Sequence, residues 1–377
     1  MNPSRICFVV SSPLSAKAFL SGHIAALSAR YGVDLVADAK QPSDLTEIAP
    51  YARILPVGIR RPVAPLADLA ALAKLYLLFR RERYAVVSSV TPKAGLLALL
   101  AGALARVPVR IHVFTGQVWV TRTGWKRRLL KAADRLMACL ATHVLADSPS
   151  QRDFMAVEGV APADKISVLG EGSICGVDGE RFRPDPAKRM EVRRMQGIPA
   201  EAVVFLFLGR LNRDKGILDL AGAFASLGDE RAWLLVVGPD EAGMRAEMER
   251  RLGTDAAHCR FVGYTDRPED YMAAADVFCL PSYREGFGMV VIEAAAAGVP
   301  AVASRIYGIT DAVEDGVTGL LHRPGDGGDI ARAMSALARD ASRRAAMGHA
   351  AQERAVRLFS RRAVTGAWER FYGQLLG

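Results

Sequence analysis

The chain has 377 residues, 51% of them hydrophobic, which is enough for two domains that each bury a core and excludes a disordered protein. Its five scattered cysteines contain no Cys-x-x-Cys pair. This argues against a disulfide framework or a structural metal site and fits a reducing compartment. The longest apolar helix candidate, residues 94–105, is far shorter than the roughly 20 residues that cross a bilayer.

The net charge of +9 is unevenly distributed along the chain. Residues 1–180 carry 22 Lys and Arg against 14 Asp and Glu, whereas the remainder carries 27 against 26. The basic half is therefore expected to meet an anionic partner. No nucleic-acid-binding module is recognisable, and the apolar run 6–10 is too short for a secretory signal. We expect a cytoplasmic protein that is soluble or lies on a membrane.

Two series of short apolar runs alternate with helical stretches. Because strands without polar alternation are buried on both faces, each series predicts a parallel sheet covered by helices. The predicted fold class is thus α/β, with two doubly wound, Rossmann-like domains. The first series of predicted strands covers residues 6–10, 33–37, 85–90, 109–114 and 143–147, and the second covers 203–209, 233–238, 260–263, 277–281 and 300–304.

The boundary between the domains is expected in residues 171–199, where turn-forming residues gather and predict a linker. Ligands of such domains bind at the carboxyl ends of the strands, so two domains facing each other would form a binding cleft. A last amphipathic helix can pack back on the first domain through Trp368, Phe371 and Tyr372. The predicted parts are a first domain over 1–175, a second over 176–360 and the C-terminal helix over 361–377.

A basic turn follows the first predicted strand of the second domain. Gly209 ends that strand, Arg210 and Lys215 flank the turn, and Gly216 opens a helix. Glycine lets the backbone approach a ligand, a helix N-terminus favours anions, and two cations can neutralise a diphosphate. A solvated basic loop is an equally weighted alternative.

Two carboxylates accompany a glycine-rich turn and an unusually apolar helix in residues 282–298. Glu285 precedes the helix, and Glu293 stands inside it among apolar neighbours. A buried carboxylate needs a partner, because desolvation costs several kcal/mol. The hydroxyls of a ligand ribose are one candidate partner for Glu293, and a buried Arg is the alternative.

Glu285 and Glu293, separated by seven residues, resemble the E-x7-E signature of retaining glycosyltransferase family 4. Residues 209–216 resemble that family's phosphate-binding stretch. Residues 316–321 resemble its N-G-x-x-G-x-L segment, with Asp315 at the Asn position and with Gly316 and Gly319 interpreted as structural turns. The resemblance implies the GT-B architecture, with acceptor binding in the first domain and donor binding mainly in the second.

The resemblance also implies roles for individual residues. Arg210 and Lys215 would hold the diphosphate of a UDP-sugar and stabilise the departing oxygen, so neither metal nor cofactor would be required. The sequence contains no Asp-x-Asp, the usual metal–diphosphate clamp of the other glycosyltransferase architecture. Glu293 would bind the ribose and Glu285 the transferred sugar, and the sugar would keep its configuration by same-face attack. The implied donor site comprises Gly209, Arg210, Lys215, Glu285, Gly286, Phe287, Gly288, Val290 and Glu293.

Residues 91–95, 110–119 and 172–178 resemble a narrower group that builds bacterial surface polysaccharides and lipid-linked glycans. An example of that group is the N-acetylgalactosaminyltransferases that extend undecaprenyl-diphosphate-linked diacetylbacillosamine. The acceptor implied is a lipid-linked saccharide. Many members of family 4 have a His before the Gly of this loop, where this chain has Thr115. His112 lies three residues earlier, so either side chain is a candidate to contact the reacting sugar, and a hydrogen-bonded strand residue is the alternative for His112.

Basic and apolar residues mix in residues 125–131, near Trp119. This stretch, with Arg60–Arg61 and Arg80–Arg81, is a candidate surface for anionic lipid, at about 1 kcal/mol for each Lys or Arg near the membrane. A solvated helix face is the alternative. The expected location is therefore the cytoplasmic face of the inner membrane.

Two other functions fit the same architecture. A UDP-sugar 2-epimerase would need paired acid–base groups around the sugar, and the six His form no evident pair. A non-catalytic nucleotide-sugar binder would not need Arg210, Lys215, Glu285 and Glu293 together.

Overall fold

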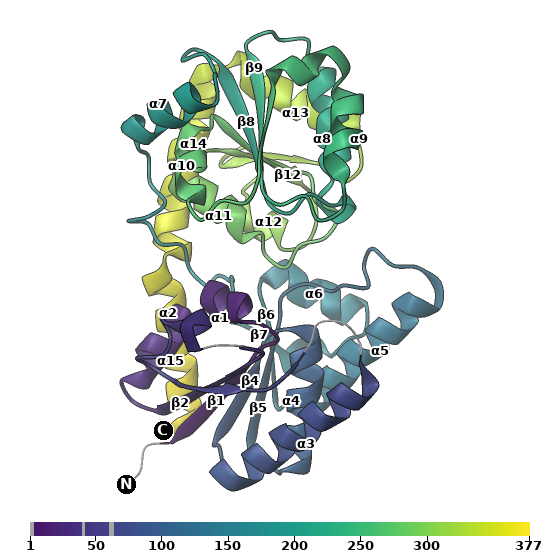
Figure 1. The fold of residues 1–377 in the computed structure, drawn as a ribbon, viewed down its shortest axis with the longest axis vertical. Coiled ribbons are helices and arrows are strands. Elements are labelled where there is room, and N and C mark those ends of the chain that lie inside the picture. The colour runs from purple at the N-terminus through teal and green to yellow at the C-terminus, as the bar shows by residue number, and fades with distance from the viewer. Residues whose placement is uncertain (1–3, 40–41, 60–63) are drawn as a thin grey trace. The chain divides into compact units, whose positions relative to one another are not determined.

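The computed structural model describes residues 4–39, 42–59 and 64–377 (Figure 1). It contains two compact units, one formed by residues 1–176 with 361–377 and the other by residues 177–360. Each unit is a parallel sheet between helices, which confirms the predicted α/β class with two doubly wound domains. No helix among the described residues is both long and apolar enough to cross a bilayer.

The first unit contains a seven-stranded sheet in the order β3-β2-β1-β4-β5-β6-β7. The strand order changes direction between β1 and β4. In such sheets, ligands bind at the carboxyl ends of the strands that flank this switch point. The strands are β1 (Arg5–Val9), β2 (Gly32–Ala37), β3 (Arg53–Pro56), β4 (Val86–Ser89), β5 (Val109–Phe114), β6 (His143–Ala146) and β7 (Ile166–Val168). The helices are α1 (Pro13–Phe19), α2 (Ser21–Ser28), α3 (Pro65–Glu82), α4 (Pro92–Leu104), α5 (Gly124–Leu140), α6 (Pro149–Val157) and α15 (Arg361–Leu376), with 3-10 turns η1 (Pro42–Leu45) and η2 (Ala163–Lys165).

Alternate residues of β1 enter separate cores on the two faces of this sheet, as the two-residue period of a strand requires. Ile6 and Phe8 pack in the core that includes α15, whereas Cys7 and Val9 pack under α3 and α4. On the first face, the Trp368 ring stacks on His23 with centroids 4.3 Å apart. The C-terminal helix therefore belongs to the first unit, and α3, α4 and α5 cover the other face (Figure 1).

The second unit contains a six-stranded sheet in the order β10-β9-β8-β11-β12-β13. Its strands β8 and β9 are almost wholly buried, as expected for unalternating apolar runs. The strands are β8 (Val203–Leu208), β9 (Ala232–Val237), β10 (Cys259–Val262), β11 (Val277–Leu280), β12 (Ala301–Ser304) and β13 (Gly319–His322). The helices are α7 (Pro186–Met195), α8 (Ile217–Ala225), α9 (Met244–Leu252), α10 (Pro268–Ala274), α11 (Met289–Ala296), α12 (Ile309–Ala312), α13 (Gly327–Arg339) and α14 (Ala341–Phe359), with 3-10 turns η3 (Arg213–Lys215) and η4 (Gly253–His258).

One prediction about local structure was wrong, and another was right only in part, because the units divide at residues 176–177 within the expected stretch 171–199. Gly319 is the first residue of β13 and not a turn, and a Cβ there would lie 2.4 Å from the carbonyl oxygen of Ala301 on β12. Glycine is needed at this position because the two backbones approach closely. The stretch 171–199 is not a continuous linker, because it contains α7, which Asp185 caps and whose buried Arg193 pairs with Asp276 at 2.6 Å.

Candidate functional site

Two loops meet at the carboxyl edge of the second sheet, where β8 and β11 are neighbours. Residues 209–216 follow β8, and residues 281–288 follow β11. The backbone N–H of Tyr283 donates to the carbonyl of Asp214 at 2.9 Å and links the loops. Gly216 has φ +66°, and a Cβ there would lie 1.9 Å from the carbonyl oxygen of Pro281. The two loops can approach this closely only because residue 216 has no side chain.

The linked loops bring Lys215 and Glu285 together. The Lys215 Nζ lies 2.5 Å from the Glu285 Oε1, and the Ser282 hydroxyl donates to the same oxygen at 2.7 Å. The side chain of Asn212 accepts from the Lys215 backbone N–H at 3.2 Å and caps the turn that positions it. Two residues that are 70 positions apart in the sequence thus form a charged, hydrogen-bonded pair that is only 21% and 13% exposed.

Arg210 has a different partner. Its guanidinium pairs with Glu241 at 3.2 Å, and both side chains are about half exposed. Exposed ion pairs contribute only about 0.2–1 kcal/mol, so an anion can replace Glu241 with little loss of stability. Gly209, directly before Arg210, lies close to Gly238, which follows β9. A Cβ at Gly238 would lie 2.0 Å from the carbonyl oxygen of Gly209.

The turn before α11 is held in place by buried contacts within the second unit. Phe287 is buried, and its ring packs edge-on against Phe359 with centroids 5.1 Å apart, so only its backbone can reach a ligand. Gly288 has φ +84° and is the N-cap, and a Cβ there would meet the Ile309 side chain at 2.5 Å. The carbonyl of Gly286 lies against Gly308. Because the first N–H groups of a helix lack intrahelical partners, the amide at Val290 is a donor available to a ligand.

Glu293 lies in the second turn of α11 and is partly buried. Its carboxylate makes no hydrogen bond or ion pair with any residue that the structure describes. Its pKa is raised to about 7, chiefly by burial, with the charge of Arg181 opposing the shift and the charge of Glu269 adding to it. Arg181 itself pairs with Glu269 at 2.8 Å. The alternative of a buried Arg partner is therefore not what the structure contains.

Of the two candidates in the first unit, His112 is enclosed. It is 1% exposed, its Nδ1 lies 2.9 Å from the Ser89 hydroxyl, and burial lowers its pKa to about 3. A Cβ on Gly95 of α4 would meet the ring at 2.3 Å. This geometry favours the alternative of a hydrogen-bonded strand residue. Thr115 follows the carboxyl end of β5 and is partly exposed, so a ligand can reach it more readily.

Sequence reasoning missed a buried acid at the same edge of the first sheet. Asp147 follows β6 and is 3% exposed, and burial raises its pKa well above the ordinary value. Its Oδ1 has no hydrogen-bond partner among the described residues. Its backbone N–H donates to Gln151 at 2.6 Å, and its carbonyl accepts from Ser173. The sequence does contain a signal for this residue, because Asp147 stands directly between a buried strand and Ser148, the N-cap of α6.

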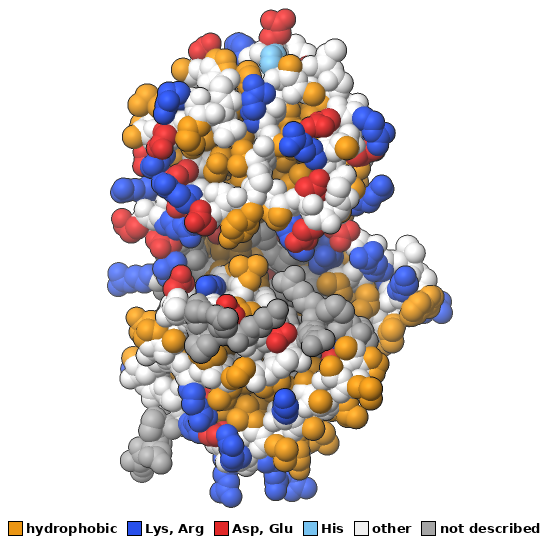
Figure 2. Space-filling view, in the orientation of Figure 1, with side chains coloured by type: hydrophobic (Ala, Val, Ile, Leu, Met, Phe, Trp, Pro, Cys, Tyr) orange, Lys and Arg blue, Asp and Glu red, His pale blue; other side chains and the backbone are white. Residues whose placement is uncertain are grey.

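The basic stretch of the first unit divides into a buried and an exposed part. Trp119, which is near the basic stretch in the sequence, is fully buried, and its indole N–H donates to Asp134 at 2.7 Å. Arg127 and Lys131 lie over its ring and pair with Glu158. The exposed part of α5 carries Trp125, Lys126, Arg128 and Leu129, and Figure 2 shows hydrophobic and basic side chains side by side there.

The two other basic pairs of the sequence contribute differently. Arg80 and Arg81 are exposed at the end of α3, where Arg81 pairs with Glu82 at 2.9 Å. Arg60–Arg61 lie outside the described residues. Among the residues that are described, no group of three or more His, Cys, Asp and Glu is arranged to hold a metal ion.

Two family models match the chain: glycosyl transferases group 1 over residues 188–354 and glycosyl transferase 4-like domain over residues 18–172. The capsular polysaccharide biosynthesis glycosyltransferase CapM of Staphylococcus aureus is 31% identical over 341 residues, which cover 89% of each chain. A D-inositol 3-phosphate glycosyltransferase of Kribbella flavida is 38% identical over 245 residues, covering 61% of this chain and 54% of that protein.

Solved structures share the fold over nearly the whole chain. HepE of Anabaena, in complex with UDP and glucose, has a TM-score of 0.80 at 22% identity, covering 98% of this chain and 100% of its own. Sucrose-phosphate synthase of Thermosynechococcus elongatus has a TM-score of 0.82 at 23% identity and covers 99% of each chain. These similarities confirm the expected GT-B fold.

Proposed function

Because the chain belongs to the group 1 glycosyltransferases and is an enzyme of that class, we propose that it transfers a sugar from a UDP-sugar to a lipid-linked saccharide with retention of configuration. The observation that carries the donor assignment is the convergence of Lys215, Glu285 and the unpaired Glu293 around the start of α11. The complex of HepE with UDP and glucose supports UDP as the nucleotide.

The diphosphate would bind between the basic turn and the start of α11. Bond cleavage places negative charge on the departing phosphate oxygen, and Lys215 and Arg210 would stabilise that charge together with the amide of Val290. These fixed positive groups would supply the stabilisation without a metal ion or another cofactor. Arg210 would exchange Glu241 for phosphate, whereas Lys215 would keep its contact to Glu285.

The two carboxylates would orient the rest of the donor. Glu293 would accept hydrogen bonds from the ribose hydroxyls, the partners that it lacks within the protein. Glu285, held by Lys215 and Ser282, would bind a hydroxyl of the transferred sugar. The acceptor hydroxyl would attack from the face that the diphosphate leaves, and its proton would pass to the departing phosphate oxygen. The product then keeps the donor's anomeric configuration.

The acceptor assignment rests on the similarity to CapM and on charge. CapM acts in capsular polysaccharide biosynthesis, and we infer a related assembly role here. A lipid-linked acceptor, such as an undecaprenyl-diphosphate saccharide, presents its sugar at an anionic membrane. The exposed Trp125, Lys126, Arg128 and Leu129 of α5 suit the cytoplasmic surface of such a membrane.

The proposal is tested with a panel of UDP-hexoses and UDP-N-acetylhexosamines, each incubated with and without undecaprenyl-diphosphate-linked saccharides. We expect sugar transfer from one donor to the lipid-linked acceptor. Interconversion of UDP-sugars without acceptor would instead show an epimerase. UDP-sugar binding with no turnover on any acceptor would show a non-catalytic binder.

A further inference from the structure

A basic cavity that is separate from the proposed donor site lies at the amino-terminal ends of β4 and β5 in the first unit. It has a volume of about 420 Å³ and is bounded by the end of α3 and the turn after α4. Its lining includes Phe79, Tyr84 and Pro108. Arg80, Arg83 and Arg106 also line it, and all three side chains are exposed to solvent.

None of these three arginines pairs with a described residue. Arg80, Arg83 and Arg106 make no ion pair and no side-chain hydrogen bond within that part of the chain. The guanidinium group stays protonated at any pH that proteins encounter, so three positive charges share one cavity without compensation. An anion placed among them would relieve their mutual repulsion.

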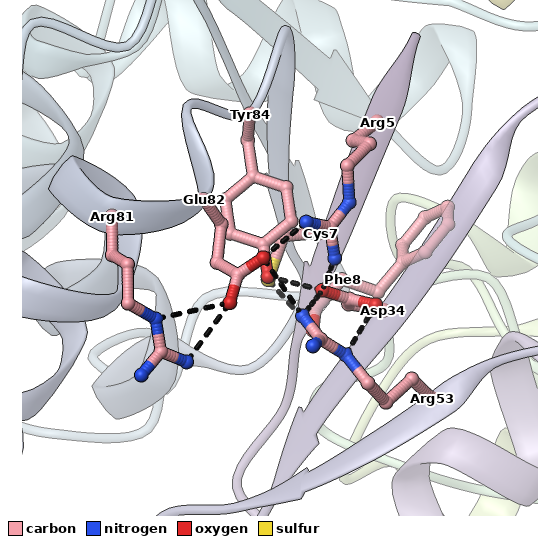
Figure 3. Close-up of polar contacts among 8 residues, drawn as sticks. All are labelled: Arg5, Cys7, Phe8, Asp34, Arg53, Arg81, Glu82 and Tyr84. Carbon is pink, nitrogen blue, oxygen red and sulfur yellow. Dashed lines mark hydrogen bonds and ion pairs between the residues drawn. The ribbon is translucent and has the colours of Figure 1, made fainter. Parts of the chain in front are cut away.

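The carboxylates closest to this cavity in the sequence are already neutralised. Glu82, between Arg80 and Arg83, pairs with Arg5, Arg53 and Arg81. Tyr84, which is buried beside the cavity, donates its hydroxyl proton to Asp34, which also pairs with Arg5 and Arg53. Figure 3 shows this network as a set of mutual contacts. It provides no free acceptor for Arg80, Arg83 or Arg106.

The backbone at two of the three arginines is strained. Arg83, the C-cap of α3, has φ +50°, and Arg106, after α4, has φ +58°. Glycine is the usual residue in this left-handed conformation, and a side chain there costs about 1 kcal/mol. Within the described residues only one other non-glycine residue has positive φ. Arginines also stabilise helix C-termini, but Arg80 and Arg81 already occupy the last turn of α3, so that role does not explain Arg83.

We propose that this cavity binds a phosphate group, gripped by the guanidinium groups of Arg80, Arg83 and Arg106. Guanidinium and phosphate match in charge and in bidentate hydrogen-bond geometry. The phosphate can belong to a small soluble phosphate compound or to the headgroup of an anionic phospholipid. Either source brings the same chemistry.

The test uses the double variant Arg83→Gly/Arg106→Gly of the full chain. Glycine suits both backbone conformations, so this variant is expected to fold with an unfolding temperature at or above that of the wild type. Binding of inorganic phosphate is measured by calorimetry at constant ionic strength, with saturating UDP to occupy the proposed donor site. The control Arg30→Ala/Arg362→Ala removes two exposed arginines of the same unit.

A second arm measures binding to vesicles of phosphatidylglycerol and of phosphatidylcholine. A loss of phosphate affinity of about tenfold or more in the glycine variant, absent from the control, supports a soluble phosphate ligand. The same selective loss with phosphatidylglycerol vesicles alone supports a lipid headgroup. If the glycine variant and the control bind both probes as the wild type does, or lose affinity equally, the cavity is not a phosphate site. Saturating UDP is present in every calorimetry sample and sugar transfer is not measured, so a selective loss in the glycine variant does not depend on the proposed transfer reaction.

Discussion

Lys215 and Glu285 illustrate how a single residue pair can serve both the resting protein and the proposed reaction. In the absence of donor, each neutralises the other at 2.5 Å, which avoids a partly buried unpaired charge. When a diphosphate binds, the ammonium has further hydrogen-bond donors to offer, because a lysine carries three. If the diphosphate binds here as proposed, the pair needs no large rearrangement to receive it.

We predict that Lys215→Ala lowers kcat/KM by about 2–4 kcal/mol of transition-state stabilisation, because a preorganised donor to the leaving oxygen is lost. Steady-state kinetics with the identified donor measures this loss. Arg213→Ala removes an exposed cation from the same turn and serves as the control, with kcat/KM near that of the wild type. Equal effects of the two substitutions would show that only the net charge of the loop matters.

A pH dependence is predicted for Glu293. Its pKa is raised to about 7, so the carboxylate that accepts ribose hydroxyls forms only as the pH rises through 7. The affinity of the wild type for UDP should increase between pH 6 and 8 more than that of Glu293→Gln, which has no titrating group there. The variant also controls for ionisation of the phosphate itself. If calorimetry gives parallel pH profiles of UDP affinity for the wild type and the variant, Glu293 does not bind the ribose.

The raised pKa of Glu293 also predicts how the stability of the fold depends on pH. A carboxyl group whose pKa is raised on folding holds its proton more tightly in the folded state, so stability falls as pH rises from about 4.3 to 7. Above pH 7 Glu293→Gln should therefore be more stable than the wild type, by on the order of 2 kcal/mol. This advantage should vanish near pH 4. Denaturant unfolding at several pH values measures it, and a variant less stable at pH 8 would contradict the account.

The resemblance to the E-x7-E signature singled out Glu285 and Glu293 before any coordinates, and the structure places Glu285 in the loop before α11 and Glu293 in its second turn. The surroundings of His112 could not be predicted in this way. Its enclosure depends on Gly95 of α4 and Ser89 of β4, which approach it only in three dimensions. The sequence motifs thus singled out two loops that the structure brings together, whereas the accessibility of single side chains depended on tertiary packing.

At the scale of elements, the apolar strands and the C-terminal helix were predictable, whereas three of the four edge strands of the two sheets were not. β3 is half exposed along its length, β7 has three residues, and β13 begins with a glycine. None of these has the apolar run that identifies a buried strand. These strands are stabilised by pairing with an adjacent strand of the sheet. The pattern of a single sequence does not show which strands are adjacent.

The close approach of the two donor loops gives a prediction about stability. Gly216→Ala would place a methyl group 1.9 Å from the carbonyl oxygen of Pro281 at φ +66°, so the loops must separate. We expect a loss of about 2 kcal/mol or more in the free energy of unfolding. Gly222→Ala, in the exposed interior of α8 with no heavy atom within 4 Å, should instead stabilise by about 0.5–1 kcal/mol. Denaturant unfolding that gave both variants the same sign would contradict the role of Gly216.

The exposed face of α5 gives a prediction about membranes. Reversing the charge at Lys126 and Arg128 should weaken binding to anionic vesicles, whereas Arg127 is left intact because it pairs with Glu158. Added salt should weaken wild-type binding in the same way, since exposed charges are screened over about 8–10 Å. Co-sedimentation at low and high salt measures both effects. Charge reversal at Arg30 and Arg362 is the control, and equal losses in both variants would show that only net charge acts.

At the scale of the whole molecule, charge and chemistry are divided between the two halves of the chain. The residues assigned to the donor all lie in the second unit, whose half of the sequence is nearly neutral. The surplus of positive charge lies in the first half, which also contains the exposed face of α5. This division suits an enzyme that binds a soluble nucleotide-sugar through one unit and works at an anionic surface through the other.

The central claim is retaining transfer of a sugar from UDP to an acceptor hydroxyl, and the anomeric configuration of the product tests it most directly. The enzyme is incubated with its UDP-sugar and a lipid-linked acceptor, and NMR of the purified product gives the coupling of the new anomeric proton. We predict a product with the donor's own configuration and no product from Lys215→Ala at short times. A product of inverted configuration would contradict the proposed mechanism, because same-face attack on the donor cannot form it.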